Sequence, residues 1–165
     1  APPKPQNGVV KTFDENGKIE TIETFKNGVW DGKYEGFAYI PQASLHYKTE
    51  EGYYVKGKKT GIWKYYDFYY DSKTGKLGDK LITYRIETYK NGKRNGKSIE
   101  YDPKYGFKLI ESNFIADKEN GIRKNYCPHG KDRGKLYFFN EVINDQIVRS
   151  YNYQCDCDQS TPERY

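Results

Sequence analysis

Three cysteines carry the most specific chemistry in this chain of 165 residues. Cys127 stands alone, whereas Cys155 and Cys157 form a Cys-Asp-Cys motif near the end. A disulfide bond from Cys127 to one of these two is the simplest prediction. His129 would complete a zinc set of Cys-x-His plus Cys-x-Cys, although zinc sites usually place about two to four residues between paired ligands. One disulfide would leave one thiol over, which is unfavourable in an oxidising compartment. Free cysteines are the remaining alternative.

A second group of reactive side chains consists of basic residues set among glycines. Lys58, Lys59, Lys93 and Arg94 have this setting and could contact phosphate groups. The chain has 28 Lys and Arg residues against 23 Asp and Glu residues, which gives a formal net charge of +5. Acidic residues are spread throughout, however, and no standard nucleic-acid-binding motif is present. We therefore predict no nucleic-acid partner and treat these cations as candidates for contacts with another surface.

Catalytic motifs are absent from the sequence. The chain has only two histidines, His46 and His129, and neither belongs to a His-Glu-x-x-His motif. No Gly-x-Ser-x-Gly elbow occurs either. Paired acids such as Glu50 and Glu51 become catalytic candidates only inside a cleft that shifts their pKa values. The sequence therefore predicts a non-enzymatic protein with no cofactor.

The glycines belong to an internal repeat. In each copy an aromatic residue at position 0 is followed by Gly or Asp at +3, Gly at +7 and another aromatic residue at +12. We expect a worn fifth copy from Phe139 to Tyr151, and Gly8 with Phe13 supplies half a copy at the front. Four offsets that hold over four copies indicate a repeat protein. The four clear copies begin at Phe25, Tyr54, Tyr89 and Phe114.

The elements that position these residues are predicted to be β-strands. Segments between copies alternate apolar with polar residues and are rich in Ile, Thr and Tyr, which favour strands. We expect one antiparallel hairpin per copy, with the +7 glycine close to a strand start and the Gly-x-x-x-Gly segment linking it to the next hairpin. Uneven spacing of the copies indicates insertions in surface turns. The predicted organisation is a Pro-rich leader (1–7), an all-β repeat domain (8–151) and a polar, cysteine-containing tail (152–165).

The motif resembles the MORN repeat. The Gly-x-x-x-Gly spacing, the aromatic residue five positions later and the Asn-Gly-Lys turns are similar to the bacterial variant of that repeat, often labelled an antitoxin component. This resemblance covers Gly8 to Tyr126 and, in worn form, Phe139 to Tyr151. It implies an elongated, single-layer antiparallel sheet of stacked hairpins with an aromatic-lined face. The insert "IPQASLHYKTEEG" and the cysteine-bearing tail depart from the family's pattern.

The two tryptophans occupy different positions in the repeat. Trp63 follows the +7 glycine by two residues, where an aromatic residue resembles the family's usual choice, so we expect it to pack. Trp30 falls between the paired glycines, where other copies have polar residues, and we expect it on a partly exposed link that could anchor a partner. The candidate binding residues are therefore Trp30, Lys58, Lys59, Trp63, Lys93 and Arg94.

These features predict a binding module that presents an aromatic and charged repeat surface to a protein partner. The alternative is a peripheral binder of anionic lipid, glycan or another surface polymer. No apolar run in the sequence is long enough to span a membrane, although peripheral contact is compatible with this composition. The Pro-rich start, which lacks Met, resembles what remains after removal of a signal peptide and favours an extracytoplasmic location, periplasmic or secreted.

Overall fold

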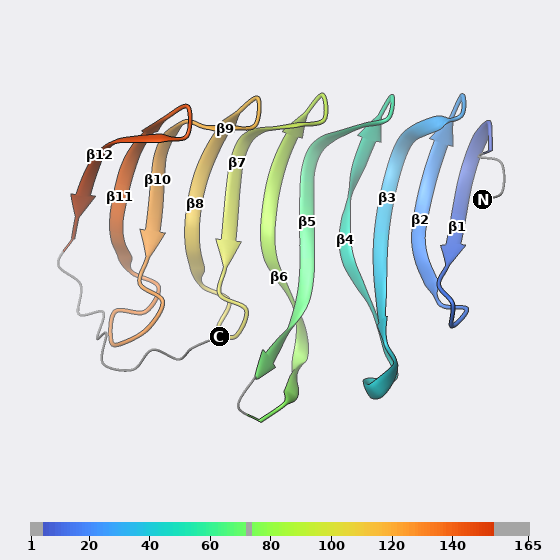
Figure 1. Ribbon diagram of the computed structural model, residues 1–165, viewed down its shortest axis with the longest axis horizontal. Helices are drawn as coiled ribbons and strands as arrows, with labels where there is room; N and C mark the ends of the chain where they lie inside the picture. The colour runs from blue at the N-terminus through green and yellow to red at the C-terminus, as the bar shows by residue number, and fades with distance from the viewer. Residues whose placement is uncertain (1–4, 72–73, 154–165) are drawn as a thin grey trace.

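A computed structural model describes residues 5–71 and 74–153 of the protein. These residues form one open antiparallel sheet of 12 strands, and strands that follow one another in the sequence pair with each other, except that one two-residue strand lies off the main path (Figure 1). The predicted all-β fold with an elongated single-layer sheet is confirmed. The strands are β1 (Asn7–Phe13), β2 (Ile19–Lys26), β3 (Val29–Ile40), β4 (Leu45–Val55), β5 (Lys58–Asp71), β6 (Lys76–Lys90), β7 (Lys93–Tyr101), β8 (Lys108–Ile115), β9 (Lys118–Glu119), β10 (Gly121–Tyr126), β11 (Leu136–Ile143) and β12 (Gln146–Asn152).

Tight turns of a single kind line one edge of the sheet, at the top of Figure 1. Both central residues of each turn have φ between 48° and 82°, as a type I′ hairpin turn requires. The Gly-x-x-x-Gly segment is therefore not a link between separate hairpins, because its first glycine lies in a hairpin turn itself. We call this border the turn edge. Its two-residue turns in the described chain are Asn27–Gly28, Lys56–Gly57, Asn91–Gly92, Ala116–Asp117 and Asn144–Asp145.

The opposite border carries loops of different lengths. The insert of the second copy lengthens β3 and β4, and the short 3-10 helix η1 (Pro41–Ala43) connects these two strands. Asp14 and Asp102 close two of the other loops, because a carboxylate oxygen of each accepts two backbone N–H bonds. The uneven spacing of the repeats arises at this loop edge, while the turn edge stays regular.

The +7 glycines sit at a bulge just after each turn. In the first copy Phe25 pairs with Trp30 but Glu23 pairs with Tyr34, so β3 contains two extra residues at this point. Gly32 has φ 130°, and a Cβ there would lie 2.7 Å from Thr24 Cγ2. Gly61 and Gly96 take φ values of 66° and 116° at equivalent bulges, which confirms that these positions disfavour a side chain.

The predicted register of the fifth copy is wrong. The turn Asn144–Asp145 places Val142, not Phe139, at position 0 of this copy. Val142 is only 2% exposed, like the aromatic residues at position 0 of the first and fourth copies. Two aromatic residues 12 positions apart matched the motif by coincidence, whereas the turn residues reveal the true register.

Adjacent repeats are joined along the turn edge by a recurring backbone bond. The N–H at +3 donates to the carbonyl oxygen at +5 of the preceding repeat, over 2.7–3.0 Å. In four of the turns described, the N–H at +2 also donates to an Asn or Asp side chain at +6 of the preceding repeat. These bonds fix the turns side by side. The backbone pairs are Gly28 with Gln6, Gly57 with Trp30, Gly92 with Lys59, Asp117 with Arg94 and Asp145 with Glu119.

The side chains at 0 and +5 face each other on one side of the sheet, which we call the network face. Phe25 with Trp30 and Tyr54 with Lys59 are such cross-strand pairs. This face holds the core of the protein, because the most buried apolar side chains on the strands occupy it. Residues at +1 and +4 lie on the opposite face, since side chains alternate along a strand.

Candidate binding surfaces

Lys59 occupies an aromatic cage on the network face rather than open solvent. Its Nζ lies 3.8 Å from the ring centroid of Trp63 and 5.4 Å from those of Tyr65 and Tyr89. Glu50 lies 3.7 Å from the same nitrogen. Burial lowers the pKa of Lys59, while the neighbouring carboxylates oppose that change. The cage already contains a cation, so Lys59 is poorly placed to contact a phosphate group.

Trp63 forms the centre of an aromatic cluster and is fully buried. Its ring lies 5.1 Å from that of Tyr54 and 5.6 Å from that of Tyr34, and its Nε1 donates to the Tyr53 carbonyl oxygen over 3.3 Å. The side chain packs, as expected, and is not available as a surface anchor. Trp30 lies in β3 rather than on a link, is partly exposed, and donates from Nε1 to Glu23 over 3.0 Å.

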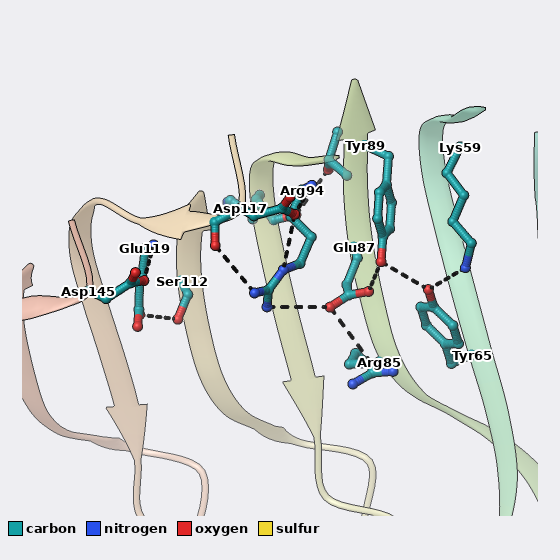
Figure 2. A network of polar contacts seen from close by, with 12 residues as sticks. Lys59, Tyr65, Arg85, Glu87, Tyr89, Arg94, Ser112, Asp117, Glu119 and Asp145 are labelled. Carbon is teal, nitrogen blue, oxygen red and sulfur yellow. Dashed lines mark hydrogen bonds and ion pairs between the residues drawn. The ribbon is translucent and has the colours of Figure 1, made fainter. Parts of the chain in front are cut away.

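A chain of polar contacts continues from this cluster across β5, β6 and β7 (Figure 2). Tyr65 and Tyr89 join their hydroxyl groups at 3.3 Å, and Tyr89 donates to Glu87 over 2.7 Å. The Glu87 carboxylate also lies 4.0 Å from both Arg85 and Arg94. This glutamate is buried, so its negative charge is balanced inside the protein rather than by solvent.

Two aspartates on the turn edge extend the network. Asp117 and Asp145 replace the +3 glycine in their copies, and each accepts a backbone N–H from the preceding repeat, of Arg94 and Glu119 respectively. The distances are 2.7 Å and 2.6 Å. The Asp117 carboxylate also lies 3.9 Å from the Arg94 side chain. Arg94 is thereby held by acids, which limits its use as a free surface cation.

The phenol groups of this face are protonated at neutral pH, and burial moves their pKa values further above it. It raises the pKa of Tyr34 and Tyr54 to about 12 and is also the main reason that the pKa values of Tyr65 and Tyr89 are raised. These hydroxyl groups therefore act as hydrogen-bond donors and acceptors, not as proton-transfer groups near pH 7. The arrangement is suited to holding the sheet face rigid.

A group of exposed lysines lies instead beside the turns, mostly on the opposite face. Residues at +1 and +4 form the cross-strand pair that flanks each turn, and Lys26 with Val29, Val55 with Lys58 and Ile115 with Lys118 are such pairs. The aliphatic members are 45%, 50% and 57% exposed, in that order. Lysine and aliphatic side chains therefore share one border of the sheet, which includes the exposed lysines Lys26, Lys56, Lys58, Lys90, Lys93 and Lys118.

The structure thus divides the predicted site residues between two places. Lys58 and Lys93 lie on the exposed border, whereas Lys59 and Arg94, one residue later, point to the network face. Sequence reasoning missed Lys26, Lys90 and Lys118, although their position beside a two-residue turn is a usable signal. It also missed the Asn or Asp at +6, which precedes the +7 glycine in most copies.

Cys127 is fully buried and disulfide-bonded, so it carries no free thiol. Its sulfur lies 3.0 Å from the carbonyl oxygen of His129. Cys155 and Cys157 lie outside the described residues, and their pairing stays a prediction. Within residues 5–71 and 74–153, no group of three or more His, Cys, Asp or Glu side chains is arranged to hold a metal ion.

No helix in the described part of the chain is long and apolar enough to cross a membrane. No protein family, curated protein or solved structure matches the chain.

Proposed function

We propose that the protein is a non-enzymatic binding module whose turn edge docks an acidic protein partner. The observation that carries this proposal is the pairing of an exposed lysine with an exposed aliphatic side chain beside three of the described turns, together with the lysine pair Lys90 and Lys93 beside a fourth. Apolar surface rimmed by charge is typical of protein–protein contacts. Positive charge in such a rim favours a partner of opposite sign.

The rigidity of the turn edge supports a docking role. Each turn is tied to its neighbour by the bond between +3 and +5, so the spacing between successive lysines is fixed before a partner arrives. A preorganised surface loses little conformational entropy on binding. In contrast, Lys59 and Arg94 on the network face already lie beside the carboxylates of Glu50, Glu87 and Asp117.

The proposal is tested by charge reversal and salt titration. The partner is captured from the native organism, identified and purified, and its affinity is measured for the wild type and for Lys58→Glu/Lys93→Glu. We expect the double variant to weaken binding by at least about tenfold, since like charges would then face each other. Added salt should weaken wild-type binding only in part, because the aliphatic contacts are not screened.

A matched control separates local from global charge. Lys11→Glu/Lys80→Glu changes the net charge equally at exposed residues away from the turn edge. This variant should bind like the wild type. Equal losses for the two double variants, or no loss for Lys58→Glu/Lys93→Glu, would contradict docking at the turn edge.

A peripheral membrane binder is the second candidate, because lysines that alternate with aliphatic side chains also suit an anionic lipid surface. The two functions differ in their ligand. Cosedimentation with phosphatidylserine-containing vesicles that is lost in Lys58→Glu/Lys93→Glu, together with recovery of no protein partner, would favour the membrane and overturn the first candidate.

A further inference from the structure

A small pocket opens on the network face between β6, β7, β8 and β10, with a volume of about 130 Å³. Its origin is a change at position +9 of the repeat. The first two copies fill this position with Tyr34 and Trp63, whereas the third copy has Ser98. Because Ser98 has no ring, the third copy keeps a space at this position that an aromatic side chain fills in the first two copies.

Polar side chains line this space. Ser98 and Ser112 are each only 8% exposed, and Phe114 contributes an apolar wall that carries the Arg94 guanidinium 4.0 Å from its ring centroid. Figure 2 shows Arg85, Glu87 and Arg94 on one side and Ser112 with Glu119 on the other. The lining residues are Arg85, Glu87, Arg94, Ser98, Glu100, Ile110, Ser112, Phe114, Glu119 and Arg123.

Two arginine side chains of this pocket each keep one buried donor without an acceptor. The two oxygens of Glu87 face Tyr89 and the arginines, and those of Glu119 face Ser112 and Arg123. A guanidinium group has five N–H donors. The Nε atoms of Arg85 and Arg123 are nevertheless buried without a hydrogen-bond partner, since the Arg85 Nε lies 4.0 Å from Glu87.

Buried donors without acceptors are costly, so the pocket is complementary to a ligand that brings acceptor oxygens. We propose that it binds a carboxylate group. Arginine recognises this planar anion through paired N–H bonds. The lining has three arginines against three glutamates, so its formal charge is balanced, and a singly charged carboxylate would add less uncompensated negative charge than a phosphate dianion.

The approach to the pocket is open. The side chains of Arg85, Arg94 and Arg123 are 35%, 37% and 34% exposed, so each reaches from the pocket to solvent. The carboxylate can belong to a free small molecule or to an Asp or Glu side chain of another protein. This site lies on the network face and does not depend on docking at the turn edge.

The test is nuclear magnetic resonance of the arginine side chains in ¹⁵N-labelled protein. Sodium acetate is titrated at constant ionic strength against sodium chloride, and the Nε–H signals of Arg85 and Arg123 are followed. We expect acetate, but not chloride, to shift both signals in a saturable way. Acetyl-glutamate amide, with the uncharged acetyl-glutamine amide as its control, then distinguishes the two sources. Shifts with the glutamate compound show that a peptide side chain enters the pocket. Shifts with acetate but not with the glutamate compound assign the pocket to free carboxylates.

Two variants and one control variant keep the test decisive. Ser98→Trp restores the large ring of the second copy and should abolish the shifts. Arg123→Gln should weaken acetate binding by about tenfold, as expected for a lost charge-assisted bond, while Arg149→Gln on the exposed strand β12 should leave it unchanged. The proposal is overturned by the absence of saturable shifts in the wild type, by equal shifts with chloride, or by acetate binding that Arg123→Gln leaves intact.

Discussion

Gly52 and Trp63 form a contact that a single methyl group should break. A Cβ atom built on Gly52 would lie 2.3 Å from Cδ2 and Cε2 of the Trp63 ring. Ordinary carbon–carbon contacts are about 3.5–4.0 Å, so the ring would have to move by more than about 1 Å. The φ angle of Gly52 is outside the left-handed region, and the backbone itself therefore accepts alanine. Since Trp63 is fully buried, we expect Gly52→Ala to cost about 3 kcal/mol of unfolding free energy, at the upper end of overpacking.

The assay is urea unfolding followed by circular dichroism in two backgrounds. In Trp63→Ser, which imitates Ser98 of the third copy, the added methyl group meets no ring, and Gly52→Ala should change the unfolding free energy by less than about 0.5 kcal/mol. Gly57→Ala is the control, because Gly57 has no neighbour within 4 Å and only its φ of 75° opposes a side chain. Equal costs of Gly52→Ala in both backgrounds would refute the steric explanation.

Further predictions concern the bonds between repeats, the acid limit of stability and the disulfide. Asn95→Ala removes the side-chain oxygen that accepts the Ala116 N–H and should lower the unfolding free energy by about 1 kcal/mol in urea titrations; an unchanged midpoint would contradict this role. The hydrogen bond from Tyr66 lowers the pKa of Glu51 from its ordinary 4.5, so this carboxylate stabilises the fold above pH 4.5 and the contribution is lost as pH falls further. Tyr66→Phe should therefore make the melting temperature less sensitive to pH below 4.5, and an unaltered acid profile would count against it. Reduction of the Cys127 disulfide should lower the melting temperature by several degrees with little loss of sheet signal at 25 °C, whereas an unchanged melting curve would argue against a stabilising bond.

The repeat and its strands could be predicted because glycine and aromatic spacing are written directly in the sequence, whereas the single-layer sheet was expected from the resemblance to the MORN repeat. The face of the sheet on which each cation lies could not be predicted from the sequence. Lys58 and Lys59 are neighbours, yet one flanks a turn and the other enters an aromatic cage, and that difference depends on the register set by the turn at Lys56–Gly57. The carbonyl at +5 that joins the repeats has no sequence signature, because every residue has a carbonyl group.

The start of the fifth copy could not be predicted from its aromatic residues either. Its aromatic residues suggested a start at Phe139, whereas Asn144 and Asp145 adopt positive φ and set the start at Val142. The pocket could not be predicted either, because it depends on the pairing of Ser98 with Ser112 on the neighbouring strand. A repeat sequence thus predicts the scaffold well, while its surfaces depend on which side of each strand the variable positions occupy.

Docking at the turn edge is tested most directly by lysine acetylation footprinting of the complex with its purified partner. In the free protein, exposed Lys58 and Lys93 should react faster with acetic anhydride than Lys59, whose amine is enclosed by the aromatic cage. In the complex, mass spectrometry should show strong protection of Lys58 and Lys93, while Lys11 and Lys80 react as before. Unchanged reactivity of Lys58 and Lys93 in a saturated complex would contradict the proposed docking surface.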